Sequence, residues 1–269
     1  MLEEIAERIK SLPPLPKSFH QMSLICQDPN ASVNDLARVI EEDPMMVANL
    51  LKVANSPLYG FRREIKNVVQ AVGLFGMSTT RSLVMDMSIK KLLHVDMAPY
   101  NVTPEEFAAI SNLQSSLMLQ WYGKVDPSKV DLLFLAALLQ ETGKILIADE
   151  IAKNNETFQF RSEIESCSNI ADVERTFVRI SSSEVTARIF KHWKFDKTMV
   201  EAIEYTDTLG AASEAIRPYA FALKVVKTAI PLNAPLSERS INLALNLLEK
   251  EKYDKELFLG VINKLKELY

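Results

Sequence analysis

The chain has 269 residues, of which 48% are hydrophobic and 25% are charged, and its formal net charge is −4. This balance is typical of a globular protein and excludes an intrinsically disordered one. The negative net charge argues against non-specific binding of nucleic acid, because the phosphate backbone requires a positively charged protein surface.

Helix follows helix in the first half of the chain. Apolar residues at helical spacing predict an amphipathic helix over residues 1–10, and the prolines of Leu12–Pro16 then impose an extended connector. Capping residues mark the starts of the helices that follow: Ser32, Asp43 with Pro44 behind it, Asn67 and Ser78. No strand-like alternation interrupts the pattern. This half therefore predicts an all-α structure.

The stretch from Asn55 to Gly60, with sequence NSPLYG, ends one of these helices. Asparagine and serine side chains bond backbone groups left open at a helix end, and glycine adopts a positive φ. An aromatic residue and two arginines follow at once, and these residue types are enriched at protein interfaces. We assign to this junction and interaction surface the residues Asn55, Ser56, Tyr59, Gly60, Arg62 and Arg63.

The second half begins near residue 95, so we predict an N-terminal helical subdomain over residues 1–95 and a helical bundle over residues 96–269. Thr103 starts a capping box for a helix that is expected to end at Gly123. Asp126 is then expected to cap a central helix whose eight apolar residues, Leu132–Leu139, suit burial on nearly all sides. Gly143 is expected to break that helix.

The rest of the bundle is again helical by its periodicity. The polar stretch of residues 153–168 shows little periodicity and predicts no helix. Helices are predicted over residues 170–180, 184–193, 199–205, 214–230, 241–251 and 256–268.

Two sequence features bear on localisation. No apolar run reaches the ~20 residues that span a bilayer, and the acidic, amphipathic start of the chain is not a signal peptide. Cys26 and Cys167 lie far apart without a motif around either, as expected of reduced thiols. We expect a cytoplasmic protein without a membrane partner.

The residues after the central helix carry a family resemblance. Gln140-Glu141 is followed by Gly143-Lys144, and this resembles the signature of the HD phosphohydrolases, in which His-Asp precedes Gly-Lys. The segments LPPLP, EEDP, LLKVANSPLYG and AVGLFG occur upstream in that order. Together they resemble the HDOD domain, an HD-related output domain of bacterial signalling proteins, from about Leu12 to about Asp207. The resemblance implies an HD-like helical bundle.

The resemblance also implies where metal ligands would lie, and this chain departs from that pattern at each position. The matched residues form a degenerate pocket made of Gln114, Gln140, Glu141, Lys144, Ser182, Thr206 and Asp207. The three histidines, His20, His94 and His192, lie elsewhere. Imidazole is a ligand that transition metals favour, so we expect no metal, no cofactor and no catalytic residue.

The degenerate pocket still has to satisfy its polar groups, because buried donors and acceptors are hydrogen-bonded in native proteins. We expect Gln114, Gln140 and Glu141 to bond one another or ordered water. Lys144 is expected to pair with Glu141 across one helical turn.

The function that these features indicate is non-catalytic signal transduction through protein contacts, with motility or another two-component output as the setting. The HDOD resemblance is usually accompanied by receiver or second-messenger domains, and this chain shows none, so it is expected to meet its regulatory partner in trans. Binding of a small-molecule ligand in the degenerate pocket is an open alternative. The alternatives are a residual metal-dependent phosphohydrolase acting on a nucleotide or cyclic dinucleotide, and a nucleic-acid-associated regulator that uses Arg62, Arg63 and Lys66. The acidic total counts against the second alternative.

Overall fold

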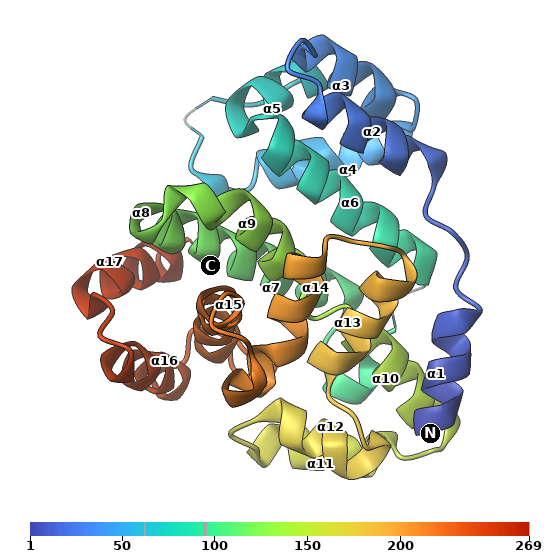
Figure 1. Ribbon diagram of the computed structural model, residues 1–269, viewed down its shortest axis with the longest axis vertical. Helices are drawn as coiled ribbons and strands as arrows, with labels where there is room; N and C mark the ends of the chain where they lie inside the picture. Colours follow the sequence, from blue (N-terminus) through green and yellow to red (C-terminus); the bar gives the residue numbers. More distant parts are fainter. Residues whose placement is uncertain (62, 94–95, 269) are drawn as a thin grey trace. The chain divides into compact units, whose positions relative to one another are not determined.

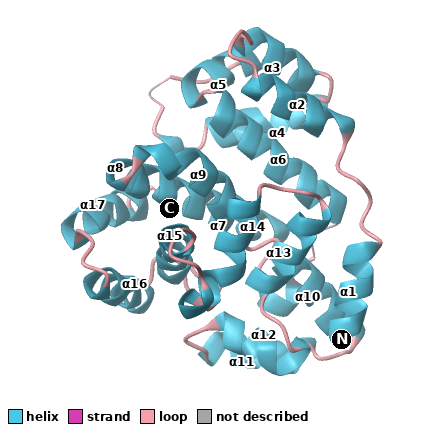
Figure 2. Cartoon of the chain, in the orientation of Figure 1, coloured by secondary structure: helices cyan, strands magenta, loops and turns pink. Residues whose placement is uncertain are grey.

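The computed structural model describes residues 1–61, 63–93 and 96–268. Within these ranges the chain is helical and contains no β-strand, which confirms the predicted all-α fold (Figure 2). Two units form. The small unit comprises Pro14–Leu92 with Leu268, and the large unit comprises Met1–Pro13 and Leu93–Glu267.

The small unit is a cluster of short helices that begin at the predicted caps. Ser32 and Asp35 form a capping box, the Asp43 side chain accepts from two backbone N–H groups, and Asn67 accepts from the Gln70 N–H. The helix predicted to start after Ser78 starts at Met77, directly after Gly76 with its φ of 80°. The helices are α2 (Lys17–Gln27), α3 (Val33–Glu41), α4 (Pro44–Ala54), α5 (Val68–Phe75) and α6 (Met77–Leu93).

The large unit is organised around α9, which is apolar on every side and packs against α7, α14 and α15 (Figure 1). Its side chains from Leu133 to Leu139 are all buried, as the sequence predicts. The helices are α1 (Leu2–Lys10), α7 (Pro104–Leu117), α8 (Gly123–Val125), α9 (Val130–Leu139), α10 (Gly143–Lys153), α11 (Thr157–Ser166), α12 (Ile170–Val178), α13 (Ser182–His192), α14 (Lys197–Glu204), α15 (Arg217–Ala229), α16 (Glu238–Lys250) and α17 (Lys255–Lys266).

Several sequence-based helix boundaries are wrong. Gly123 does not end a helix, because α7 passes into the π-helical turn Met118–Tyr122 and then into α8. Asp126 caps the 3-10 turn Pro127–Lys129 that precedes α9. The polar stretch near residue 160 forms α11, whose buried Phe160 and Ile164 anchor an otherwise polar helix.

The first helix belongs to the large unit, whereas the sequence analysis grouped it with residues 1–95. It packs against α10 and α13, and Arg8 forms an ion pair with Asp149 of α10. The Trp193 Nε1–H, directly after α13, donates to the Pro13 carbonyl over 3.0 Å. Among residues 1–61, 63–93 and 96–268, no helix combines the length and hydrophobicity that crossing a bilayer requires.

Candidate functional site

The turn between α9 and α10 delivers the polar residues of the degenerate pocket. The prediction that Gly143 breaks the central helix is wrong, because α9 already ends at Leu139 and Gly143 starts α10. A Cβ at Gly143 would lie 2.3 Å from the Ser182 carbonyl oxygen and 2.7 Å from the Thr186 nitrogen. The Gly143 N–H instead donates to the Thr186 hydroxyl over 2.7 Å. Only glycine allows α10 to approach α13 this closely, and the approach brings Lys144 against the start of α13.

The glutamines of the pocket are fully buried and bond each other. Gln140 Nε2 donates to Gln114 Oε1 over 2.9 Å. Gln114 Nε2 donates to Glu141 Oε1 over 3.2 Å and to the Ile230 carbonyl over 2.9 Å. The predicted hydrogen bonds among these three side chains are therefore present, and they join α7 to the α9–α10 turn and to the end of α15.

Lys144 lies at the centre of a second group of contacts, with a side chain that is only 1% exposed. Its ammonium donates to Glu174 Oε1 over 2.6 Å and to the Ser182 hydroxyl over 3.0 Å. The predicted pairing with Glu141 is also present, with 3.3 Å between Nζ and Oε2. The ammonium thus donates two hydrogen bonds and forms ion pairs with two carboxylates, those of Glu174 and Glu141.

Glu174 on α12 completes this closed cluster. Its Oε1 also accepts from the Tyr100 hydroxyl over 2.9 Å, and its Oε2 accepts from the Ser182 backbone N–H over 2.6 Å. Burial, with a contribution from the adjacent Glu174 carboxylate, raises the pKa of Tyr100 well above its ordinary value. Tyr100 is therefore a permanent donor, and every oxygen of Glu174 has a partner.

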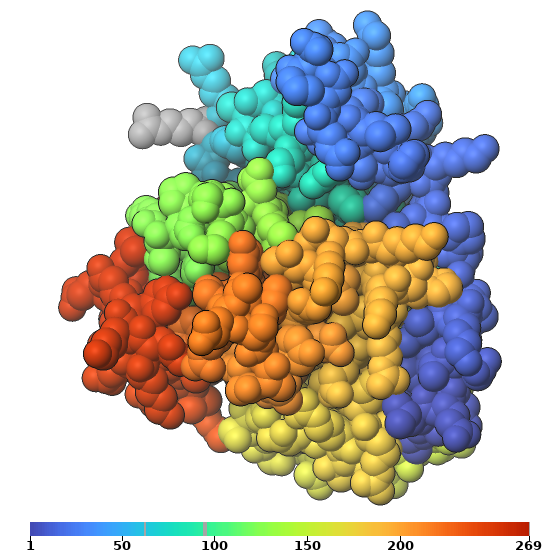
Figure 3. Space-filling model, viewed as in Figure 1, coloured from blue at the N-terminus to red at the C-terminus, as the bar shows by residue number. Residues whose placement is uncertain are grey.

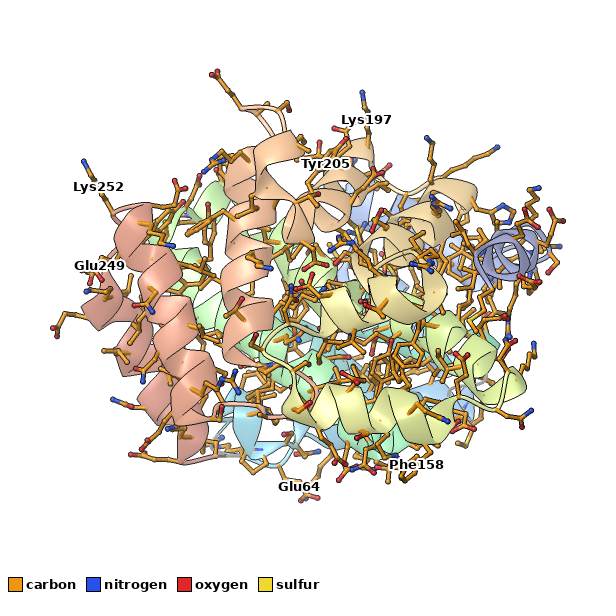
Figure 4. All side chains as sticks on the ribbon, turned by 90° about the horizontal axis from the view of Figure 1, so that it is seen from below. Glu64, Phe158, Lys197, Tyr205, Glu249 and Lys252 are labelled. Carbon is orange, nitrogen blue, oxygen red and sulfur yellow. The ribbon has the colours of Figure 1, made fainter. Side chains whose placement is uncertain are left out.

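A further charged cluster surrounds Asp207, the last residue of the 3-10 turn Tyr205–Asp207. Figure 4 labels Tyr205, the first residue of this turn. Asp207 Oδ2 lies 3.0 Å from the Lys227 ammonium, and Oδ1 lies 3.4 Å from the Lys224 ammonium. Lys227 also donates to the Ser183 hydroxyl over 2.8 Å. Lys227 and Lys224 thus share one carboxylate.

These pairings set the ionisation of the Asp207 cluster. Burial alone would raise the pKa of Asp207, but the charges of Lys227 and Lys224 outweigh it, and the pKa lies below the ordinary value of 3.8. Burial lowers the pKa of Lys224, an effect that the nearby Lys227 reinforces and that Asp207 only partly offsets. Lys227 has a raised pKa, because Asp207 and other carboxylates outweigh its burial.

Not all predicted pocket residues meet in these clusters. Thr206 is buried, but its hydroxyl donates to the Ala202 carbonyl of its own helical segment. Sequence reasoning missed four residues that contribute: Tyr100, Glu174, Lys224 and Lys227. A signal for the two lysines exists, because they interrupt the largely apolar run AFALKVVKTA of α15 at a spacing that places both on one helix face.

The predicted junction residues meet in the small unit. Asn55 Nδ2 donates to the carbonyls of Leu51 (2.9 Å) and Ile65 (2.8 Å), and Asn55 Oδ1 accepts from the Ile65 N–H over 2.8 Å. Ser56 accepts from the Leu58 N–H, and Gly60 has a φ of 65°. The junction is therefore fixed mainly by one asparagine.

Aromatic rings extend this junction. Tyr59 and Phe61 each contact the Phe75 ring edge-on, with centroid distances of 4.9 and 5.2 Å. Arg63 is exposed. Arg62 and His94 lie outside the described residues.

A cavity of about 320 Å³ opens beside both charged clusters of the large unit. Glu141, Lys144, Asp207, Lys224 and Lys227 line its floor. The first turns of α12 and α16 contribute to its walls.

A comparison with protein families tests the resemblance to the HDOD domain. The family model described as "HDOD domain" matches residues 12–209, which is more than half of the chain. The chain belongs to the HDOD domain family. The match covers nearly the same residues as the predicted one, and it ends before α15 and α16.

Solved structures share this HDOD fold. A virulence factor from Campylobacter jejuni subsp. jejuni is 27% identical, with a TM-score of 0.60 over 98% of this chain and 95% of that chain. A Marinobacter aquaeolei protein, provisionally described as a signal transduction protein, is 21% identical, with a TM-score of 0.71 over 96% of this chain and 57% of that one. A Shewanella amazonensis protein, provisionally described as a metal-dependent phosphohydrolase, is 21% identical, with a TM-score of 0.67 over 100% of this chain and 97% of that one.

One curated relative matches as well, an uncharacterised protein of Treponema pallidum. It is 20% identical over 220 residues, which make up 80% of this chain. The chain spans only 41% of the length of that relative.

The pocket of this HDOD chain does not fit the metal that the HD resemblance implies. The matched positions offer two amides, two carboxylates and two hydroxyls, but no imidazole, and the Lys144 ammonium lies within 3.3 Å of both Glu141 and Ser182. A fixed positive charge in contact with the donors repels a metal cation. In the described part of the chain, no group of three or more His, Cys, Asp or Glu residues is arranged to hold a metal.

Proposed function

We propose that this HDOD chain is a non-catalytic signal-transduction module that acts through contacts with a regulatory protein in trans, in a motility pathway or another two-component output. The observation that carries the proposal is the position of Lys144. Its ammonium bonds Glu174 and Ser182 and pairs with Glu141, where metal chemistry would need open coordination positions. The pocket that would perform hydrolysis is used instead to join α10, α12 and α13.

The comparisons support a signalling role rather than a particular pathway. The family is that of HDOD domains, and the Marinobacter protein is provisionally described as a signal transduction protein. Because its identity to this chain is below 25%, the likeness shows only the fold. The partner, the setting and the absence of catalysis are our proposals.

The competing function is residual phosphohydrolase activity, which the Shewanella relative's description and the cavity beside Glu141 favour. A direct assay separates the two. The protein is incubated with p-nitrophenyl phosphate and bis-p-nitrophenyl phosphate in the presence of Mg²⁺, Mn²⁺ or Fe²⁺, alongside a Glu141→Gln variant purified identically. We expect the same background rate from both proteins. Turnover by the wild type that Glu141→Gln abolishes would establish the phosphohydrolase.

Partner capture tests the signalling proposal itself. The tagged protein is cross-linked in its native cells, and recovered proteins are compared with those of an Arg62→Ala, Arg63→Ala double variant. Arg38→Ala is the matched control, because Arg38 is 79% exposed in the same unit. We expect the double variant to have the same melting temperature as the wild type. It should fail to recover one regulatory partner that the wild type and Arg38→Ala both recover reproducibly. Equal recovery by all three proteins would remove the interaction surface from the proposal.

A further inference from the structure

The cavity of the large unit has a basic side that the closed Lys144 cluster does not explain. In Figure 3 the surfaces of α12 (yellow), α15 (orange) and α16 (red) adjoin one another. Lys224 and Lys227 of α15 line the cavity together with Ser237 and Arg239 at the start of α16. All four residues follow residue 209, where the match to the HDOD family ends.

Hydrogen-bond donors remain on this basic side. An ammonium group carries three N–H donors. Among the described residues, Lys227 has two hydrogen-bond partners, Asp207 and the Ser183 hydroxyl, and Lys224 has one, Asp207 at 3.4 Å. These two partly buried ammonium groups therefore share one carboxylate, and three of their six N–H donors have no partner within the described part of the chain. A partly buried, incompletely compensated cation favours the arrival of an anion.

The start of α16 adds to the positive electrostatic potential of this side of the cavity. The Ser237 hydroxyl accepts from the Ser240 N–H, but the first N–H groups of a helix have no intrahelical partner and attract negative charge. Arg239 in this first turn is exposed and forms no hydrogen bond or ion pair with any described residue. The first turn of α12 faces the cavity as well.

The carboxylates that line the cavity are already engaged. Glu141 pairs with Lys144, and Asp207 pairs with the two lysines of α15. Glu165 is exposed at the wall, 3.5 Å from the Asn101 side-chain amide. On the basic side, the positive charges of Lys224, Lys227 and Arg239 therefore outnumber the single negative charge of Asp207.

Part of the cavity lining is apolar. Leu243, with 38% of its surface exposed, and the half-buried Leu247 line the cavity from α16, and Ile170 lines it from α12. A cavity of about 320 Å³ with convergent polar groups and an apolar wall resembles small-molecule sites. An inorganic ion would leave this wall uncovered.

We infer that this cavity binds a small organic anion, a phosphate monoester or a carboxylate. The anionic group contacts Lys224, Lys227, Arg239 and the start of α16, and the apolar part covers Leu243. The inference deepens the proposed function and rests on it only where the ligand acts as a signal, because such a ligand would change partner binding. Binding itself involves no covalent step and no metal.

Calorimetric titration of the full chain with four probes tests this chemistry. Phenyl phosphate and benzoate carry both an anion and an apolar ring, inorganic phosphate lacks the ring, and phenol lacks the charge. We expect phenyl phosphate or benzoate to bind with a Kd near or below about 1 mM, inorganic phosphate to bind more weakly, and phenol not to bind. The tighter of the two ring anions identifies the headgroup. Failure of both, or equal binding of phenol, overturns the inference.

Three variants localise the binding. Lys224→Gln with Arg239→Gln should weaken the bound ring anion by roughly tenfold or more, because two charged contacts are lost while Lys227 still pairs with Asp207. Leu243→Ser should weaken the ring anion but leave inorganic phosphate unchanged. Arg188→Gln, an exposed arginine of α13 outside the cavity, is the control and should bind as the wild type does.

The variants also guard against a folding artefact. Arg239→Gln alone changes only an exposed side chain, so it must weaken binding without changing the melting temperature. Unchanged affinity in both the single and the double variant places any bound probe elsewhere and overturns the site. The partner-capture experiment is independent of these titrations. A chain that binds phenyl phosphate but recovers no partner keeps the site and loses the signalling role.

Discussion

Two charged clusters lie next to the same cavity and solve the problem of buried charge in different ways. In the closed cluster, one ammonium, that of Lys144, contacts two carboxylates and a hydroxyl, and the glutamines behind it bond one another. In the open cluster, two ammonium groups share Asp207 and keep spare donors. The difference separates a structural role from a binding role, because only incompletely paired groups gain from a ligand.

The largest expected effect comes from removing the centre of the closed cluster. Lys144→Ala leaves the Glu141 and Glu174 carboxylates buried without a cation, so the free energy of unfolding should fall by about 3–5 kcal/mol. Urea denaturation measures it, with the exposed Lys191→Ala as the control. A loss below about 1 kcal/mol would show that the closed cluster does not stabilise the fold, contrary to the structural role assigned to it.

A second substitution tests the backbone approach that forms the closed cluster. Gly143→Ala places a Cβ 2.3 Å from the Ser182 carbonyl, so α10 and α13 must separate, at a cost of about 1–3 kcal/mol. Gly260→Ala is the matched control in α17, where an added Cβ meets nothing within 4 Å. That change should raise stability by up to about 1 kcal/mol, because alanine favours a helix interior. Equal effects at the two glycines would contradict the packing argument.

The junction of the small unit provides a neutral reference for the charged clusters. Asn55→Ala removes three hydrogen bonds to Leu51 and Ile65 and should cost about 1–2 kcal/mol. Because no ion pair is lost, the cost should be the same at low and high salt. A strong salt dependence would mean that the loss is electrostatic and that the hydrogen-bond account is wrong.

A smaller effect should appear in the pH dependence of the open cluster. The pKa of folded Asp207 lies below the ordinary value of 3.8, so its stabilisation is present above that value and is lost as the pH falls through the folded pKa. Asp207→Asn should therefore lower stability at pH 6 and flatten its decline between pH 4 and 2. Parallel acid profiles for the two proteins would show that Asp207 does not contribute.

The sequence predicts the fold well because its signals are local. Caps such as Asp43 and Asn67 and the apolar run after Leu132 depend only on neighbouring residues, and each has the expected effect. Prediction fails where the local structure depends on an element that is distant in the sequence. Glycine is required at position 143 because the carbonyl of Ser182 lies against it, and α11 forms because Phe160 and Ile164 are buried by other parts of the large unit.

The pocket follows the same rule. The family resemblance identifies Gln114, Gln140 and Glu141. The requirement that buried polar groups form hydrogen bonds then predicts the contacts among them. Glu174 carries no motif, and its role arises only when α12 packs beside α10. Lys224 and Lys227 leave a trace in the apolar pattern of α15, but their shared partner Asp207 is known only from the fold.

We propose that fixed side chains occupy the place where an HD enzyme holds its metal. Elemental analysis of the desalted protein, purified from cells supplied with iron, manganese and zinc, tests this proposal. We expect no stoichiometric metal in the wild type, and none in a Gln140→His, Glu141→Asp variant, because Gln114, Ser182 and the Lys144 ammonium still occupy the pocket. One or two equivalents of metal in the wild type would contradict the claim.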